Sequence, residues 1–224
     1  MEHQKLLIWR PWRNVCGNVC TYSPNLPLMR IEPVTLEGRF VRLEPLSLAH
    51  AAHLCEAGLD QELWRWTASR VRTPDEMRRY IETALEWQRQ GTALPFAIIA
   101  CASGRAVGST RYGNIDPAHR RLEIGWTWVA RTAQRTAINT ESKYLLLRHA
   151  FETLGCIRVE FKTDALNERS RAALLRIGAK EEGILRSHMV TADGRVRDSV
   201  YYSILATEWP KVKAGLEEKL ARPA

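Results

Sequence analysis

Residues 134–141, Gln-Arg-Thr-Ala-Ile-Asn-Thr-Glu, have the residue types of a turn that binds phosphate. They follow an extended apolar segment at 122–129 and open an amphipathic stretch that predicts a helix to about Leu154. A polar turn between a strand and a helix leaves the first N–H groups of the helix without intrahelical partners. The aligned peptide dipoles of the helix favour an anion at that end. The sequence therefore predicts a diphosphate site at this turn.

Motifs for other ligands are weak or missing. The turn lacks the glycine patterns of dinucleotide-binding folds and of P-loop nucleoside triphosphatases. Cys16 and Cys20 are four positions apart, but no second Cys or His pair follows at metal-ligand spacing, so no metal is expected. The five cysteines are an odd number in a chain that can form a core without disulfides. Reduced thiols and a cytoplasmic protein are therefore expected.

The composition predicts one ordinary domain with an extension. Of the 224 residues, 45% are hydrophobic, which is enough for a sizeable core. No apolar stretch approaches the roughly 18 residues that a membrane span requires, so no membrane partner is expected. The net charge of +8 suits an anionic ligand or simply a solvated surface. No strand pair alternates basic and aromatic residues, which argues against a nucleic-acid partner.

Two regions differ in their sequence pattern. Residues 1–30 place Trp and Pro without a period of 2 or 3.6, which predicts an irregular N-terminal extension. Residues 31–224 carry the periodic segments and are expected to form a single domain. Met29 stands just before this pattern and could serve as a translation start.

The periodic segments predict alternating strands and helices. Strands are expected at 40–46, 96–101, 106–112, 121–129, 157–163, 181–190 and 196–206. Helices are expected at 47–58, from 73, from the 134–141 turn to about 154, at 167–178, and from 207. The segment at 73–76 is a capping box with proline at the first helical position. This order predicts an α+β fold in which helices cover both faces of a mixed sheet.

Four sequence pieces carry a family resemblance when they are taken together. They lie at 35–43, at 121–126, at 134–141, and at 167–171 with the downstream 177–179. On these pieces the chain resembles the GCN5-related N-acetyltransferases (GNAT), and within them the ribosomal-protein N-acetyltransferase branch of RimJ/RimL type, over about residues 33–212. The resemblance implies a GNAT-like central mixed, mostly antiparallel sheet flanked by helices on both faces. It also implies an enzyme that uses acetyl-CoA as cosubstrate.

The resemblance further implies where acetyl-CoA binds. Its diphosphate would lie on the backbone N–H groups of the turn, and its pantetheine arm would run beside the backbone at the end of the preceding strand. The implied contacts are Trp128, Val129, Gln134, Arg135, Thr136, Ala137, Ile138, Asn139 and Thr140. In the family, the strands that correspond to 121–129 and 157–163 splay apart and admit the thioester.

The turn departs from the family pattern Gln/Arg-x-x-Gly-x-Gly/Ala. Gln134 matches the pattern, but Ala137 and Asn139 stand at the glycine positions. Glycine lets a backbone approach a diphosphate without an intervening Cβ. Alanine adds one methyl group and still fits a first helical turn, so binding is expected to persist.

Glu123 is the candidate general base. Amine acetylation requires a neutral amine, and an α-amine with a pKa of about 8 demands less of a base than a lysine amine at about 10.4. Glu123 sits in mid-strand among apolar residues, next to the implied thioester gap. The alternative is that its side chain faces outward and pairs with Arg121 or Arg111.

Asn167 and Ser170 match the Asn-x-x-Ser step of the family. The resemblance implies that Asn167 orients the cofactor and that Ser170 protonates the departing thiolate. An asparagine N-cap followed by a polar residue three positions later is also ordinary helix-start chemistry, and both interpretations stay open. Tyr202 or Tyr144 could replace Ser170 as the proton donor.

Aromatic residues are the candidate acceptor contacts. Trp64, Trp66 and Trp126 could line an acceptor groove, and the 63–67 segment is expected to be partly exposed. Arg72 is a further candidate contact. The alternatives are core packing for at least one tryptophan and plain solvation for the arginine.

Direct acetyl transfer to a primary amine is the leading hypothesis, because no cysteine stands at the proposed centre to carry an acetyl group. The acceptor amine could be a protein N-terminus or a small molecule, such as an aminoglycoside or a polyamine. A non-catalytic acyl-CoA-binding module and a basic nucleic-acid-associated protein are the other classes. Members of this branch can form dimers, so a homodimer stays open.

Overall fold

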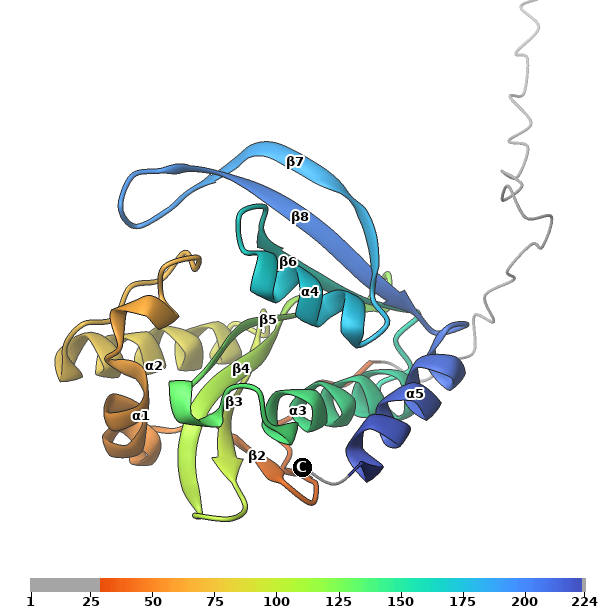
Figure 1. The fold of residues 1–224 in the computed structure, drawn as a ribbon, viewed down its shortest axis with the longest axis horizontal. Coiled ribbons are helices and arrows are strands. Elements are labelled where there is room, and N and C mark those ends of the chain that lie inside the picture. The colour runs from red at the N-terminus through yellow and green to blue at the C-terminus, as the bar shows by residue number, and fades with distance from the viewer. Residues whose placement is uncertain (1–28, 223–224) are drawn as a thin grey trace, which may run out of the picture.

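The computed structural model describes residues 29–222, so nearly all of the irregular extension expected at 1–30 lies outside the described residues. An eight-stranded sheet has the order β1-β2-β3-β4-β5-β6-β8-β7 (Figure 1). Its strands are β1 (Leu36–Glu37), β2 (Val41–Pro45), β3 (Leu94–Ala100), β4 (Arg105–Asp116), β5 (Arg121–Val129), β6 (Arg158–Asp164), β7 (Lys180–Val190) and β8 (Val196–Leu205). The helices are α1 (Ala51–Gly58), α2 (Pro74–Arg89), α3 (Ala137–Arg148), α4 (Glu168–Arg176) and α5 (Trp209–Ala221).

The expected mixed, mostly antiparallel sheet is confirmed. Strands β5 and β6 pair in parallel, while the other neighbouring pairs of the described sheet are antiparallel. A parallel pair needs a crossover connection, and α3 supplies it between β5 and β6. The start of α3 therefore lies at the carboxyl end of β5.

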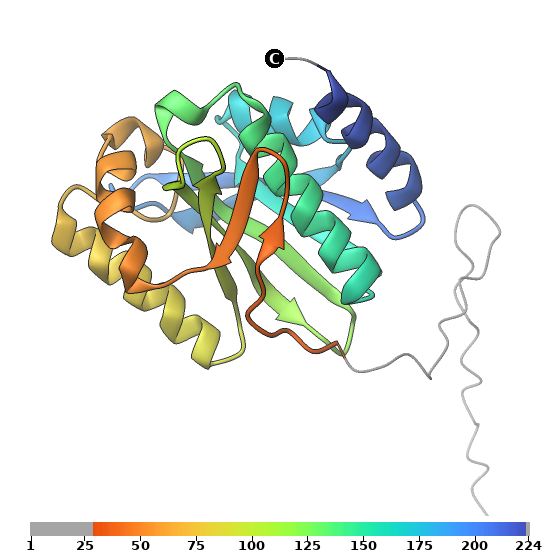
Figure 2. The same ribbon diagram turned by 90° about the horizontal axis from the view of Figure 1, so that it is seen from below.

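Helices cover both faces of the sheet, as expected. Residues of α1 and α2 pack with Ala97, Ile99 and Trp128 in one core. Residues of α3, α4 and α5 pack with Phe96 and Tyr112 in a second core on the opposite face. Figure 2 shows α1 and α2 on one side of the sheet, with α3 and α5 on the other. We call the face under α1 and α2 the acceptor face, because the candidate acceptor contact Trp64 packs there. We call the face under α3 and α4 the cofactor face, because α3 begins at the predicted diphosphate turn.

Local sequence signals account for most helix boundaries. The Thr73 side chain accepts the N–H of Glu76 at the start of α2, at 3.2 Å, as its capping box predicts. Helix α3 ends at Arg148 and continues as a π-helical turn over His149–Thr153, so the predicted stretch to about 154 has two parts. Helix α5 begins at Trp209 after the N-cap Glu208, two residues later than expected. The two-residue strand β1 was not predicted.

Candidate active site

The two parallel strands separate after the first third of β5. Their pairing is confined to 121–123 of β5 and 158–160 of β6. Strand β5 continues to Val129 and β6 to Asp164 without further pairing between them. In Figure 1 the ribbons of β5 and β6 diverge beyond this point. The β6-facing edge of residues 124–129 is therefore free of any strand partner, as in a sheet edge that can bind an extended ligand.

A bulge in β5 lies at the separation. Arg111 of β4 pairs with Gly125 and Ser109 with Trp128, so β5 contains one residue more than β4 over this interval. Trp126 takes up the extra length with a φ of 50°. Bulges redirect side chains, and here the Trp126 ring lies against the position of a Cβ at Gly113, on the acceptor face.

The turn after β5 presents its backbone to solvent. Residues 134–136 are exposed and residues 137–140 are half-buried. Thr136 is the N-cap of α3 and its hydroxyl accepts the N–H of Ile138 at 3.2 Å. Arg135 has a φ of 62°, which is uncommon for a residue other than glycine. Ala137 and Asn139 lie in the first turn of α3, where backbone N–H groups have no intrahelical acceptor.

The Gln134 side chain stabilises this turn. Its Nε2 donates to the carbonyl oxygen of Val129 at 3.0 Å. The bond ties the start of the turn to the last residue of β5, so the side chain that matches the family pattern contacts the chain itself. This contact positions the N–H groups that follow it.

A buried carboxylate fixes the first turn of α3 to the sheet edge. Glu141 accepts the N–H groups of Arg39, Phe40 and Val41 at 2.9, 2.6 and 2.8 Å. A Cβ at Gly38 would lie 2.5 Å from the Glu141 carboxyl carbon, so glycine is required for this approach. The three N–H groups replace the water that the carboxylate loses on burial.

We expect Glu141→Gln to lower the free energy of unfolding by about 2–4 kcal/mol, since an amide leaves at least one buried N–H without an acceptor. Urea unfolding measures the change. Glu217→Gln is the matched control, because Glu217 accepts one exposed bond from Tyr144. Equal stability of the two variants would contradict a structural role for Glu141.

Glu123 is buried beside the point where β5 and β6 separate. Glu123 is 2% exposed, and its side chain lies on the acceptor face of the sheet. Its Oε2 accepts Asn114 Nδ2 at 2.7 Å and lies 3.4 Å from Lys162 Nζ. Its Oε1 lies 2.7 Å from the position of a Cβ at Gly125, so that glycine leaves room for the carboxylate.

The alternative partners for Glu123 are not found. Arg121 pairs instead with Asp116, at 3.0 Å, and with Glu160, at 3.3 Å. Arg111 is 1% exposed, and its Cζ lies 5.1–5.2 Å from the ring centroids of Tyr80, Trp87 and Trp126. Its Nε and Nη2 have no hydrogen-bond partner among the described residues. Cation–π attraction to three rings offsets part of the cost of burying this guanidinium.

A buried lysine on the cofactor face was missed by sequence reasoning. Lys143 Nζ donates to Thr127 Oγ1 at 2.7 Å, and the Thr127 hydroxyl lies 2.8 Å from that of Thr110. Burial lowers the pKa of Lys143 to about 7, although the Glu123 carboxylate acts to raise it. The lysine thus hydrogen-bonds the residue that follows the bulge.

Asn167 and Ser170 lie at the start of α4. The Asn167 side chain accepts the Ser170 N–H at 3.1 Å, which is the helix-capping interpretation. Tyr202 donates its hydroxyl to Glu181 at 2.9 Å, and Tyr144 donates to Glu217 at 2.8 Å. Both alternative tyrosines therefore have carboxylate partners already. Burial raises the pKa of each phenol.

Trp64 corrects an expectation. It is 4% exposed, donates Nε1–H to the carbonyl of Gly58 at 2.7 Å, and packs on Tyr80 and Trp128. The 63–67 segment is partly exposed, as expected, but tertiary packing against α1 and β5 buries the Trp64 indole. The prediction that this side chain lines a groove is therefore wrong. Its hydrogen bond satisfies the ring nitrogen, as buried tryptophans require.

Trp66, Trp126 and Arg72 differ in position. Trp66 is half-buried. Its ring centroid lies 4.9 Å from the guanidinium carbon of Arg65 and 5.5 Å from that of Arg195 in the β7–β8 hairpin. Trp126 is half-buried on the acceptor face. Arg72 forms an exposed ion pair with Glu76 at the start of α2, which is the solvated alternative.

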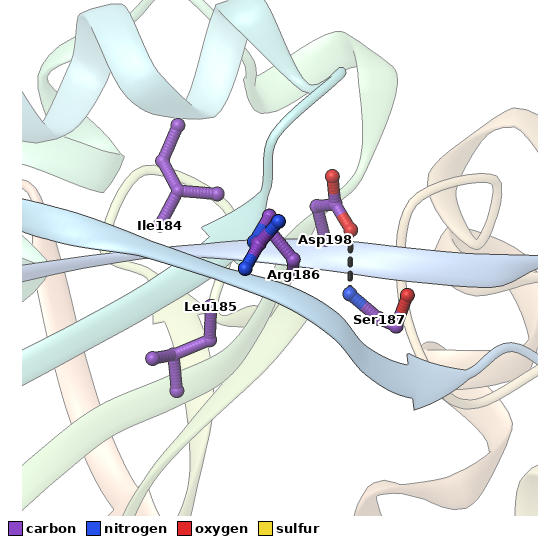
Figure 3. A pocket seen from close by; sticks show the side chains of 5 residues that line it. All are labelled: Ile184, Leu185, Arg186, Ser187 and Asp198. Carbon is purple, nitrogen blue, oxygen red and sulfur yellow. Dashed lines mark hydrogen bonds between the residues drawn. The ribbon is translucent and has the colours of Figure 1, made fainter.

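Two surface hollows lie outside the gap between β5 and β6. One, of about 690 Å³, is lined by Ile184, Leu185, Arg186, Ser187 and Asp198, and Figure 3 shows Ile184 and Leu185 on opposite sides of β7. The other, of about 620 Å³, lies between the β3–β4 hairpin and the start of α3 and is lined mainly by apolar side chains.

Residues 29–222 contain neither a candidate metal cluster nor a membrane-spanning helix. In this part of the chain, no group of three or more His, Cys, Asp or Glu side chains could hold a metal ion. None of its helices is long and apolar enough to cross a bilayer.

The model of the acetyltransferase (GNAT) domain family matches residues 41–180. The chain belongs to the GNAT family. The match spans β2 to the start of β7 and contains the separated strands, the α3 start and Glu123. GNAT membership makes this chain an N-acetyltransferase of a family that uses acetyl-CoA, with an amine as the acceptor.

Relatives agree with this membership. "Putative ribosomal N-acetyltransferase YdaF" of Bacillus subtilis (strain 168) is 33% identical over 75% of this chain and 90% of its own length. A GCN5-related N-acetyltransferase from Brucella melitensis is 34% identical, with a TM-score of 0.80 over 85% of this chain and 87% of that one. Mycobacterium smegmatis RimJ in complex with CoA-disulfide is 27% identical, with a TM-score of 0.73 over 84% and 95%.

Proposed function

We propose that this GNAT enzyme transfers acetyl from acetyl-CoA directly to a protein N-terminal α-amine. The observation that carries the proposal is the buried Glu123 beside the β5–β6 separation, with the exposed start of α3 at the far end of β5. The first feature suits a reacting amine and the second suits a diphosphate. The names of YdaF and RimJ support a ribosomal or protein acceptor.

The residues of the turn fit acetyl-CoA. The N–H groups of Ala137 and Asn139 would bind the diphosphate, with the dipole of α3 favouring its charge. The unpaired edge of 124–129 would hold the pantetheine arm by backbone hydrogen bonds. Alanine at 137 is half-buried and leaves the N–H side of the turn open. When bound, acetyl-CoA supplies the acetyl group as a reactive thioester.

Two side chains would move the protons. Glu123 would accept the proton of the attacking amine, and Asn114 and Lys162 hold its carboxylate in place. Ser170, half-buried at the start of α4, would donate a proton to the thiolate, since the hydroxyls of Tyr202 and Tyr144 are committed to carboxylates. An α-amine suits one carboxylate base, because at neutral pH a larger fraction of it is already neutral than of a lysine amine.

We also propose that residues 31–224 form one acetyltransferase domain and that the enzyme is cytoplasmic. The continuous eight-stranded sheet supports the first statement. The thiols of Cys55, Cys101 and Cys156, which are free, and the ribosomal names among relatives support the second.

Ala137→Asp tests the diphosphate site. We expect acetyl-CoA to bind roughly ten- to a hundredfold more weakly, because a carboxylate would stand beside the phosphates. Calorimetric titration measures the affinity. Ala118→Asp, an exposed position in the β4–β5 turn, is the matched control. Equal affinity of the two variants would contradict the site.

A thiol-release screen tests the acceptor. Acetyl-CoA is mixed with N-terminal peptides, polyamines and aminoglycosides, and mass spectrometry locates the acetyl group. We expect acetylation of peptide α-amines. Turnover with a small amine alone would support the small-molecule alternative, and acetyl-CoA binding without thiol release from any amine would support a non-catalytic module.

A further inference from the structure

We propose that the acceptor peptide carries an acidic side chain near its N-terminus, held by Arg195 and Arg197 where the β7–β8 hairpin meets Trp66. This inference rests on the proposed acetylation of protein N-termini and adds a specificity to it. The acidic side chain would enter from the acceptor face, on which Glu123 also lies.

One carboxylate serves two arginines at this place. Asp164 Oδ2 forms an ion pair with Arg195 Nη2 and lies 3.8 Å from Arg197 Nε. Asp164 Oδ1 already accepts the N–H of Leu166 at 2.9 Å. Arg197 is 5% exposed, and its buried Nε has no hydrogen-bond partner. The buried Arg197 Nε is therefore short of one hydrogen-bond acceptor.

Further basic side chains lie near this place. Lys162, on the same face of the sheet, pairs with Glu123 and neutralises it. Burial lowers the pKa of His188, and the positive charges of Lys162 and Arg197 lower it further, while the Glu123 carboxylate acts to raise it. A polycationic acceptor would be repelled here, whereas a carboxylate would gain charge-assisted hydrogen bonds.

The site is open on one side. The Arg195 side chain is 32% exposed and lies over the half-buried ring of Trp66, and Arg197 Nη1 donates to the Trp66 carbonyl at 3.4 Å. These contacts join the hairpin to the segment between α1 and α2, which borders the acceptor face. A ligand carboxylate can reach Arg195 from solvent and would place a second negative charge near the buried Arg197.

The spacing selects a peptide position. In the parallel register of β5 and β6, Glu123 lies opposite Glu160. Asp164 lies four residues further along β6, so the Cα atoms of Glu160 and Asp164 are roughly 13 Å apart at the rise of a strand. An extended peptide covers about 3.5 Å per residue, so a glutamate at the third position, with its side chain, spans this distance from the α-amine. The α-carboxylate of a free amino acid lies too close to its amine to do so.

The test compares Ser-Ala-Glu-Ala amide with Ser-Ala-Gln-Ala amide in the thiol-release assay. We expect kcat/KM to favour the glutamate peptide by roughly ten- to a hundredfold, the range of a hydrogen bond to a charged group. Arg195→Glu is expected to reverse the preference toward Ser-Ala-Lys-Ala amide. Arg197→Gln is expected to lower the ratio of kcat/KM for the glutamate peptide to kcat/KM for the glutamine peptide (the Glu/Gln ratio). Unfolding curves verify that each variant is folded.

The control is Arg186→Glu, which makes the same charge change on the exposed strand of the same hairpin. It should leave the Glu/Gln ratio as in the wild type. Equal kcat/KM for both peptides, or a ratio that Arg195→Glu does not alter, would overturn the inference while leaving N-terminal acetylation in place. Failure to acetylate any peptide, with turnover of small amines, would remove the proposed function and this specificity with it.

Discussion

Glu123→Gln should lower kcat by about 10²–10⁴-fold, the usual contribution of a positioned general base. Glutamine keeps the shape of the side chain and can still hydrogen-bond to Asn114, but it cannot accept the proton of the amine. Affinity for acetyl-CoA should be largely retained, because the proposed cofactor contacts lie at the far end of β5 and the start of α3. Steady-state kinetics and calorimetric titration measure the two quantities separately.

The control for this variant is Glu168→Gln, an exposed carboxylate in the first turn of α4. It should keep kcat within about twofold of the wild type, since surface substitutions have small effects. A wild-type kcat in Glu123→Gln would exclude Glu123 as the base. A parallel loss of acetyl-CoA affinity would show instead that the residue holds the fold of the gap.

Lys143→Met should remove a pH dependence of folding stability. The folded-state pKa of Lys143 is about 7 and its ordinary value is 10.5, so between these values the unfolded chain holds a proton that the folded chain lacks. Stability of the wild type therefore rises with pH from about 7, by at most about 1.4 kcal/mol per pH unit from this group. Urea unfolding at several values from pH 7 to 8.5 measures the slope.

That window isolates the lysine from other shifted groups. Burial lowers the pKa of His149 and His188 from 6.5, so their contribution to the pH dependence of stability falls below this pH range. Burial raises the pKa of Cys156 from 9.0 to about 12, so the contribution of this thiol to the pH dependence of stability falls above this pH range. Lys219→Met, an exposed lysine of α5, should retain the wild-type slope. An unchanged slope in Lys143→Met would show that the lysine stays charged when buried.

Local patterns predicted the elements that form the site. An extended apolar run located β5, alternation located β6, and the polar turn at 134–141 located the start of α3. Asn167 was predicted as a cap and is one. These features depend on residues within about four positions of each other, which a sequence pattern contains.

Contacts between distant segments could not be predicted in the same way. Glu123 is bound by Asn114 of β4 and Lys162 of β6, and nothing in the sequence near Glu123 indicates either partner. The 63–67 segment was expected to be partly exposed, and packing between α1 and β5 buries Trp64 within it. The environment of Lys143 depends on Thr127, whose direction follows from the bulge at Trp126.

Binding of CoA to the exposed start of α3 is the central claim, and amide chemical shifts test it most directly. ¹⁵N-labelled protein is titrated with CoA, and the perturbation of each backbone N–H is followed. We expect the largest shifts at residues 135–139 and along 124–129 of β5. Saturable binding that leaves the N–H groups of 135–139 unmoved, with shifts confined to the hollow at 184–187 or elsewhere, would contradict the claim.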